Sequence, residues 1–390
     1  MKSKKKTYLS KRYEWIIQSE IRNMTIECDL REGINLSQGV CDTEVPQIIK
    51  NGAKEAIDHG FNYYTRYDGL DELRCAIAHK QRKFFNMEVD PKNEIVVSAG
   101  STGAFFCACF ALLNPGDEVV LFEPYYGYHL NTLRLIEAIP KFVSTYPPDW
   151  TIDFGELKKS ISPKTRAIII NSPSNPSGKV FSLDELKKIS NLAAEKDLII
   201  FSDEIYEHFV YDGRKHIPMA TLPEMKERTV TISGLSKTFC ITGWRIGYTI
   251  CKKEWSEVIG YFNDLIYVCA PAPLQRGAVK GLLEISPEYY EKIAKDFQKK
   301  RDKLCGVLEN IGFSPYIPQG AYYVLADISI LPGKSGKEKV MYLLEKTGVA
   351  CVPGEAFYHD DYGQNLARFC FAKEDTVLDE ACERLKRLKM

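Results

Sequence analysis

From about residue 46 to residue 275, the chain alternates short runs of β-branched and apolar residues with longer amphipathic stretches. The runs are EIVVS (94–98), EVVLF (118–122), RAIII (166–170), LIIFS (198–202), TVTIS (229–233) and GYTIC (247–251). Runs that are apolar almost throughout and separated by helices are typical of a parallel sheet covered on both faces. The sequence therefore predicts an α/β fold in which a mostly parallel sheet is sandwiched by helices, in a large domain over residues 46–275.

The pattern changes after about residue 275, where long charged helical stretches accompany short strands near 321–327 and 367–372. This predicts a smaller α+β domain over residues 276–390. Residues 1–45 are too few to fold alone, so we expect them to pack on that domain, which is then built from both chain ends. In the large domain, Ser182 and Glu185 form an S-x-x-E capping box, which predicts a helix start.

The charges exclude some partners. Lys and Arg number 52 and Asp and Glu also number 52, so the formal charge is zero. A balanced chain has no broad basic face for nucleic acid, and the partners are expected to be small molecules.

The longest apolar run, around 104–113, is far shorter than the roughly 20 residues of a membrane span. The histidines show no metal-ligand spacing, so no metal is expected.

Twelve cysteines lie scattered between Cys28 and Cys382, and no pair shows C-x-x-C spacing. The basic start, MKSKKKTYLSKR, is not followed by an apolar region of signal-peptide type and predicts a solvated arm. Reduced thiols in a cytoplasmic protein fit these features better than a disulfide framework. Most of the cysteines are expected to serve as small apolar core residues.

Polar and glycine-rich segments follow four of the runs. They are Ala99–Gly103 after EIVVS, Asn171–Gly178 after RAIII, Asp203, Glu204 and Tyr206 after LIIFS, and Gly234–Lys237 after TVTIS. In an open α/β sheet, ligands bind beyond the carboxyl ends of the strands. The four segments therefore predict one shared site.

The chemistry of these segments is compatible with a single cofactor. Small residues that open a helix leave N–H groups free for a phosphate, although a tight turn has the same composition. Lys237, if desolvated beside other cations, can form a Schiff base with a carbonyl cofactor; otherwise it is a surface charge. Asp203 is a counter-charge for a pyridinium nitrogen or a helix N-cap. Arg245 lies among apolar residues in TGWRIGY and needs an anion. Together these groups meet the needs of pyridoxal phosphate.

The segment SGLSKTFCITGWRIGY resembles the lysine-containing signature of the class I/II aminotransferases, which are fold-type I pyridoxal-phosphate enzymes. Other segments resemble that family in the same order: NYYTRYDGLDELR, AGSTGA, EPYYGY, NSPSNPSG, SDEIYEHF, PQGAYYV, GVACVPGEAF and ARFCFA. The resemblance extends from about Ile34 to the end of the chain. It implies a large cofactor domain and a smaller domain that closes on the substrate.

The resemblance also implies roles at the cofactor ring. Lys237 would bind the cofactor covalently and move the proton of the substrate Cα. Asp203 would keep the pyridine nitrogen protonated, and Asn175 and Tyr206 would hydrogen-bond the phenolic oxygen. Tyr126 in EPYYGY would stack on the ring, with its neighbour Tyr125 as the alternative.

The residues that would hold the phosphate are Ser101, Thr102, Arg245 and a serine near the lysine. Many members have that serine three residues before the lysine, where this chain has Gly234. Ser233 and Ser236 flank this glycine, and both are candidates. Tyr64 resembles a tyrosine that reaches the phosphate from a neighbouring subunit, which implies a homodimer with shared active sites.

On the substrate side, Arg368 matches the arginine that grips the α-carboxylate in a bidentate fork. Asn175 would assist it, and Gly39 would line the same site through its backbone. One departure lies nearby. GVCDTEVP has Cys41 where the family usually has proline, so the loop over the substrate is expected to be less rigid.

The implied activity is a ping-pong transfer of the amino group from an L-amino acid to a 2-oxo acid. A lyase or an aminocyclopropane-carboxylate-synthase-like enzyme would share the same cofactor residues and is the main alternative. A non-catalytic module that senses the cofactor or an amino acid is a second alternative, because fold alone does not fix function. The sequence leaves the amino acid and the keto acid open.

Overall fold

The computed structural model describes residues 9–16 and 18–388. Its centre is a seven-stranded sheet in the order β2-β8-β7-β6-β5-β3-β4. The strands are β2 (Ile95–Ala99), β8 (Ile246–Ile250), β7 (Thr229–Gly234), β6 (Ile199–Asp203), β5 (Thr165–Asn171), β3 (Glu118–Glu123) and β4 (Ile139–Ser144). Only β8 runs antiparallel to its neighbours, β2 and β7. The prediction of a mostly parallel sheet is confirmed.

The six predicted runs match strands within about one residue at each end, and β4 is the strand that they missed. Its sequence, IPKFVS, contains Pro140 and little continuous apolar character. Proline is tolerated in a strand chiefly at the edge of a sheet, where one row of backbone groups faces away from the ladder. β4 pairs only with β3 in this sheet and is such an edge strand.

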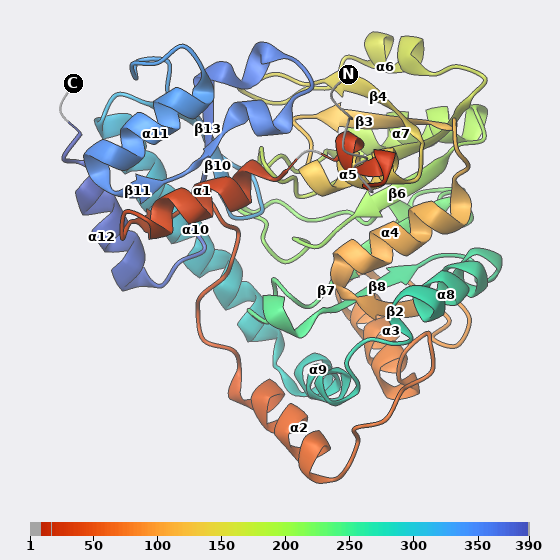
Figure 1. The fold of residues 1–390 in the computed structure, drawn as a ribbon. Coiled ribbons are helices and arrows are strands. Elements are labelled where there is room, and N and C mark those ends of the chain that lie inside the picture. The colour runs from red at the N-terminus through yellow and green to blue at the C-terminus, as the bar shows by residue number, and fades with distance from the viewer. Residues whose placement is uncertain (1–8, 17, 389–390) are drawn as a thin grey trace, which may run out of the picture.

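Helices cover both faces of the sheet (Figure 1). On one face lie α4 (Gly100–Leu112), α5 (Gly127–Leu135) and α8 (Lys253–Tyr267); on the other lie α3 (Asp71–Phe85), α6 (Phe154–Ser160), α7 (Leu183–Glu195) and α9 (Ala272–Glu284). Successive strand residues point to opposite faces. Val119 and Leu121 accordingly pack under α4 and α5, whereas Val120 packs under α6 and α7. The predicted capping box is present at the start of α7.

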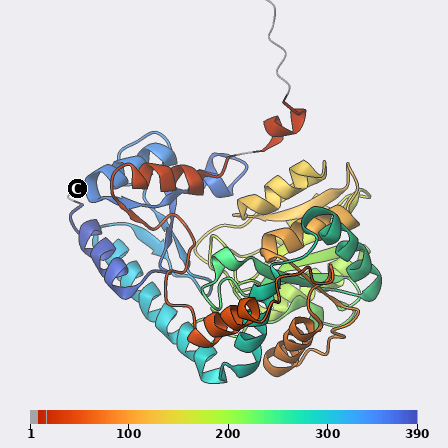
Figure 2. The same ribbon diagram turned by 60° about the horizontal axis from the view of Figure 1, so that its bottom comes forward.

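The smaller domain contains segments from both ends of the chain. Its strands are β1 (Ile34–Asn35), β9 (Ser314–Tyr316), β10 (Tyr323–Asp327), β11 (Val349–Ala350), β12 (Val352–Pro353) and β13 (Leu366–Cys370), with helices α1 (Glu20–Asp29), α10 (Pro287–Asn310), α11 (Gly336–Thr347) and α12 (Asp375–Leu385). β1 pairs in parallel with β11, and β12-β13-β10-β9 form an antiparallel sheet. Figures 1 and 2 show the red α1 beside the blue C-terminal elements.

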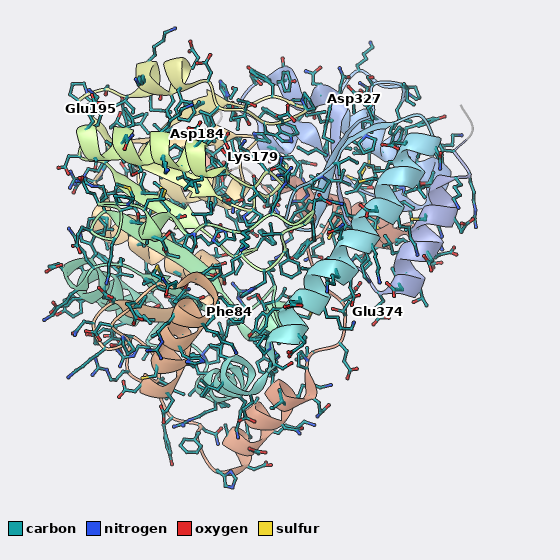
Figure 3. All side chains as sticks on the ribbon, turned by 180° about the vertical axis from the view of Figure 1, so that it is seen from behind. Phe84, Lys179, Asp184, Glu195, Asp327 and Glu374 are labelled. Atoms are coloured by element: carbon teal, nitrogen blue, oxygen red, sulfur yellow. The ribbon has the colours of Figure 1, made fainter. Side chains whose placement is uncertain are left out.

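Helix α10 connects the two parts. Seen from behind, it runs from the neighbourhood of α9 to α12 (Figure 3). The predicted boundary at residue 275 falls inside α9, which packs on α2 (Gln47–Asp58) and α3. The division into residues 1–45, 46–275 and 276–390 stays a prediction.

The short 3₁₀ helices are η1 (Lys11–Trp15), η2 (Met219–Thr221), η3 (Thr242–Trp244), η4 (Gly354–Phe357) and η5 (Asp361–Asn365). Residues 1–8 of the predicted basic arm lie outside the described residues. Beyond them, Arg12 forms an ion pair with Glu137 at 3.1 Å. Within residues 9–16 and 18–388, no helix combines the length and the apolar composition that crossing a bilayer requires.

Candidate active site

A cavity of about 450 Å³ lies at the carboxyl ends of β5, β6 and β7, with part of its lining supplied by the smaller domain. The predicted site residues that line it are Gly39, Ser101, Thr102, Tyr126, Asn175, Asp203, Tyr206, Ser236, Lys237, Arg245 and Arg368. Ser233 and Tyr64 do not line it. Its volume is in the usual range for cofactor and ligand sites. The predicted convergence of the polar segments is confirmed.

Lys237 lies in the turn after β7. Its Nζ donates a hydrogen bond to the Gly39 carbonyl oxygen at 3.0 Å. No carboxylate of the described residues forms an ion pair with it. Burial, together with the positive charges of Arg368 and Arg245, lowers the pKa of Lys237 to about 8. A fraction of the amine is therefore neutral and nucleophilic near neutral pH, as attack on an aldehyde requires.

Asp203 ends β6 and is buried. Its Oδ2 accepts a hydrogen bond from Nε2 of His129 at 3.0 Å, and its Oδ1 accepts one from the backbone N–H of Ile205 at 3.3 Å. No α-helix follows Asp203 directly, so it is not a helix N-cap. The carboxylate is fixed at the floor of the cavity, where it can balance a cationic ring nitrogen.

The glycine-rich turn after β2 opens α4. Gly100 has φ +76°, and a Cβ there would lie 2.3 Å from Nη2 of Arg245. The guanidinium of Arg245 donates to the carbonyl oxygens of Thr242 at 2.9 Å and Ala99 at 3.4 Å, and it has no carboxylate partner among the described residues. Free N–H groups at a helix start and an arginine without an anion suit a phosphate.

The two candidate serines face different surroundings. Ser236 follows β7 and lines the cavity. Ser233 lies within β7, is fully buried, and donates to Oε1 of Glu207 at 3.0 Å. Glu207 is in turn ion-paired with Lys80 of α3. Adjacent strand residues alternate between faces, and Ser233 points away from the cavity. The expectation that Ser233 binds the cofactor is therefore wrong.

Two other neighbours of predicted residues also point elsewhere. The hydroxyl of Tyr125 donates to the carbonyl oxygen of Tyr358 at 2.9 Å, whereas Tyr126 lines the cavity. Of the two candidates for stacking, only Tyr126 is in place. The carboxylate of Glu204 accepts from Ser202 at 2.8 Å and from Nε2 of His216 at 2.9 Å, outside the site.

Arg368 is fully buried in β13. Its Nη1 donates to Oδ1 of Asn175 at 2.7 Å, its Nη2 donates to the carbonyl oxygen of Ser37, and its Nε has no hydrogen-bond partner in the part of the chain that the structure describes. The guanidinium lies 4.2 Å from the ring centroid of Tyr323, and no carboxylate of the described residues pairs with it. A buried cation without a counter-ion is costly, so the site is suited to a ligand carboxylate.

Gly39 allows its own backbone segment to lie close to Tyr323 on the other side of the cavity. A Cβ at this position would lie 1.7 Å from the hydroxyl oxygen of Tyr323. That hydroxyl lies 3.1 Å from the hydroxyl of Tyr206. Glycine is therefore required by space, and its carbonyl is thereby brought to the Lys237 amine.

These residues fit pyridoxal phosphate: an amine of lowered pKa, a fixed carboxylate, an anion cradle and a buried arginine lacking an anion. The family model for class I and II aminotransferases matches residues 31–385. The chain belongs to the class I and II aminotransferase family. It is a pyridoxal-phosphate-dependent transaminase.

Relatives support this assignment over the whole chain. An aspartate aminotransferase of Pyrococcus abyssi is 37% identical, covering 97% of this chain and 98% of its own. A kynurenine–oxoglutarate transaminase of Dictyostelium discoideum is 34% identical, with 91% of each chain covered. The structure of N-succinyldiaminopimelate aminotransferase from Mycobacterium tuberculosis superposes with a TM-score of 0.93 at 33% identity, covering 97% of this chain and 99% of that one. None of these relatives supports the lyase or sensing-module alternatives.

Several residues of the transaminase site were not predicted. Arg22 of α1 and Tyr323 line the cavity, and His129 holds Asp203. Arg22 comes from a segment that reaches the cavity only through the packing of the smaller domain. His129 is a single histidine without a motif, so no sequence signal marked it. The second tyrosine of PQGAYYV is Tyr323, and that motif was the one available signal.

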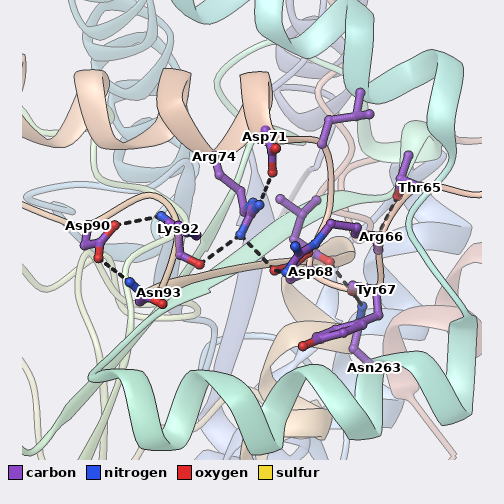
Figure 4. A network of polar contacts seen from close by, with 12 residues as sticks. Thr65, Arg66, Tyr67, Asp68, Asp71, Arg74, Asp90, Lys92, Asn93 and Asn263 are labelled. Atoms are coloured by element: carbon purple, nitrogen blue, oxygen red, sulfur yellow. Dashed lines mark hydrogen bonds and ion pairs between the residues drawn. The ribbon is translucent and has the colours of Figure 1, made fainter.

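Tyr64 does not line the cavity of its own chain. Its side chain is 82% exposed and that of Tyr63 is 84% exposed. The following segment is held firmly: the buried Arg74 donates to Oδ2 of Asp68 at 2.8 Å and to the carbonyl oxygen of Lys92 at 3.1 Å (Figure 4). Two large aromatic side chains are thus presented to solvent from an anchored segment.

Proposed function

We propose that this transaminase exchanges amino groups between L-amino acids and 2-oxo acids by a ping-pong mechanism in which one substrate pair is dicarboxylic, of the glutamate and 2-oxoglutarate type. The observation that carries the substrate class is Arg22. Its side chain lines the cavity, is exposed, and forms no ion pair with a carboxylate of the described residues. A second carboxylate on the substrate gives this guanidinium its anion.

When bound, pyridoxal phosphate supplies the electron sink that stabilises negative charge at the substrate Cα. The protein's own groups position the reactants. Arg368 holds the α-carboxylate through a guanidinium that Asn175 orients. Lys237, once its amine is free, takes and returns the proton at Cα. Asp203, fixed by His129, holds the opposite end of the cofactor through charge.

The phosphate and the ring are held by other groups in this proposal. Arg245 and the start of α4, with Ser101 and Thr102, would hold the phosphate. Ser236 is the serine that adds a hydroxyl. The hydroxyl of Tyr206 and the amide of Asn175 would hydrogen-bond the ring oxygen of the cofactor, and Tyr126 would stack on its ring. All of these residues line the same cavity, which supports the roles proposed for them.

The names of two relatives refer to dicarboxylic compounds, aspartate and oxoglutarate, and this supports the proposed substrate class. A second candidate is an aromatic amino donor. It is favoured by Tyr126 and Tyr128, whose rings line the cavity 5.1 Å apart. The two are compatible in a ping-pong enzyme, because donor and acceptor occupy the site in turn.

The test compares Arg22→Gln with Arg31→Gln, a change in the turn that follows α1, at an arginine that pairs with Glu27 outside the cavity. A charged hydrogen bond contributes about 1.5–3 kcal/mol. Arg22→Gln should therefore lower kcat/KM for glutamate and 2-oxoglutarate about 10- to 100-fold, at about 1.4 kcal/mol per tenfold. Half-reactions with methionine and phenylalanine, followed by cofactor absorbance, should change little. Equal losses for all four substrates, or none for the dicarboxylic pair, would contradict the proposed substrate class.

The proposal includes a homodimer with shared active sites, located in the cytoplasm. The exposed Tyr64 on its anchored segment supports the dimer, and the free state of the cysteines supports a reducing compartment. Sedimentation should show two chains per particle. Tyr64→Phe should weaken pyridoxal-phosphate binding without changing that mass, because only a hydroxyl is lost. Unchanged cofactor affinity would rule out the role given to Tyr64.

A further inference from the structure

Two cysteines with no part in the proposed reaction meet directly behind Lys237. The Sγ atoms of Cys41 and Cys240 lie 2.7 Å apart. The hydroxyl of Thr43 contacts both, at 3.1 Å from Cys41 and 2.9 Å from Cys240. The other ten cysteines of the chain show no such sulfur pair among the described residues. A disulfide needs an S–S distance of about 2.05 Å, so closure requires the two sulfurs to approach by about 0.65 Å.

We propose that Cys41 and Cys240 are a thiol–disulfide modification site that reacts reversibly with low-molecular-weight disulfides of the glutathione type. This goes beyond the transamination proposed above and does not depend on the substrate class. It rests on the sulfur contact, on access to Cys240, and on the position of the pair between two parts of the fold.

The access route is a second hollow of about 680 Å³ on the far side of Lys237. Cys240 and Thr43 line it, and Cys41 is buried behind them with 3% of its surface exposed. Lys292 and Lys299, both exposed, line the same hollow and connect it to solvent. Carboxylates such as Asp296 alternate with these lysines. Such a lining can hydrogen-bond both the carboxylates and the ammonium groups of a peptide disulfide.

The pair is also suited to exchange chemistry, because a thiolate is the attacking species. The hydrogen bonds that Cys240 and Thr43 supply lower the pKa of Cys41 to about 7. The same contact, together with burial, raises the pKa of Cys240, so the thiolate resides on Cys41 and Cys240 carries the shared proton. Cys240, which lines the hollow, becomes the attacking thiolate when that proton passes to Cys41 across the sulfur contact.

The exchange proceeds in two steps. The thiolate of Cys240 attacks one sulfur of the small disulfide, forming a mixed disulfide and releasing one small thiolate. The sulfur of Cys41, after losing its proton, attacks Sγ of Cys240, forming the Cys41–Cys240 bond and releasing the second small thiolate. The two cysteines lose two electrons, the small disulfide gains them, and both released thiolates take up protons.

The bond would tie two segments that meet at the active site. Cys41 belongs to the apolar core of the smaller domain, and its segment carries the Gly39 carbonyl that holds Lys237. Cys240 lies in the turn of Lys237, with its N–H bonded to the Lys237 carbonyl at 3.3 Å. Linking the two sulfurs therefore fixes the Gly39 segment against the lysine turn. Displacements near 1 Å at such positions cost about 100-fold in rate.

The experiment treats the holoenzyme with oxidised glutathione and then maps its peptides by mass spectrometry without reduction. The thiols of Cys41 and Cys240 should disappear, and a peptide linking the two should appear and be lost on adding dithiothreitol; the exposed Cys75 takes up glutathione independently of them. Cys41→Ser should stop at the mixed disulfide, retaining one glutathione on Cys240. Cys75→Ser is the matched control, because Cys75 is an exposed cysteine away from the pair. The Cys75→Ser protein should still form the Cys41–Cys240 disulfide.

Free Cys41 and Cys240 in a sample whose Cys75 carries glutathione would overturn the proposal. So would a disulfide between other cysteines only. Transaminase activity of the linked enzyme should fall at least about tenfold and return with dithiothreitol, because the Gly39 segment is displaced. A linked enzyme with full activity would refute the connection to Lys237.

Discussion

The two serines beside Lys237 provide the sharpest test of how the phosphate is held. Ser236 lines the cavity and is buried, so water cannot easily replace its hydroxyl when a phosphate is bound. A hydrogen bond to a charged group contributes about 1.5–3 kcal/mol. Ser236→Ala should therefore weaken pyridoxal-phosphate binding by about 10- to 100-fold. The free energy of unfolding of the cofactor-free protein should change little.

Ser233→Ala should instead lower the stability of the protein and leave cofactor binding nearly unchanged. The Ser233 hydroxyl donates to Oε1 of Glu207, whose Oε2 has no partner among the described residues. When this donor is removed, the buried carboxylate of Glu207 keeps its ion pair with Lys80 but loses a hydrogen bond. We expect a loss of about 1–3 kcal/mol in the free energy of unfolding, with cofactor affinity within about twofold of the wild type.

The assay is a titration of the cofactor-free protein with pyridoxal phosphate, followed by absorbance, together with urea unfolding of the same samples. The two variants are matched, because each removes one serine hydroxyl and the two serines lie three residues apart in the chain. If Ser233→Ala weakened cofactor binding as much as Ser236→Ala, the assignment of Ser233 to the opposite face would be refuted. Equal unfolding free energies for both variants would count against the Glu207 contact.

Two further predictions concern Lys237 and the segment that holds it. The pKa of Lys237 is lowered to about 8 in the cofactor-free protein, so the neutral amine appears as the pH rises through 8. Acylation of Lys237, located by mass spectrometry, should have its midpoint near there; a midpoint equal to that of free N-acetyl-lysine would contradict this. Gly39→Ala places a Cβ 1.7 Å from the Tyr323 hydroxyl and should lower kcat/KM about 100-fold. Tyr323→Phe in that background should restore part of the loss; no recovery would exclude this clash as the cause.

The sheet and the location of the site could be predicted because both depend on local pattern. Long apolar runs mark central strands whatever surrounds them, and polar residues that follow such runs meet at one edge of the sheet. β4 did not fit this pattern, because an edge strand tolerates Pro140 and partial exposure.

Side-chain direction was harder to predict than position. Ser233 and Ser236 lie three residues apart, and only the end of β7 at Gly234 decides which one faces the cavity. Arg22 and His129 were missed because each reaches the site through tertiary packing rather than through a local motif. The Cys41–Cys240 contact was missed for the same reason, since spacing along the chain shows only near neighbours.

The pairing of β1 with β11 has a consequence for synthesis of the chain. Ile34 is synthesised long before its partner, Val349. The large sheet uses no strand after β8 and can form while the C-terminal part is still being made. Met24, Cys28 and Leu36 are fully buried in the folded protein, but their apolar surfaces stay exposed to solvent until the C-terminal partners have been made. These residues are thus synthesised before the large sheet but are shielded from water and from aggregation only after it has formed.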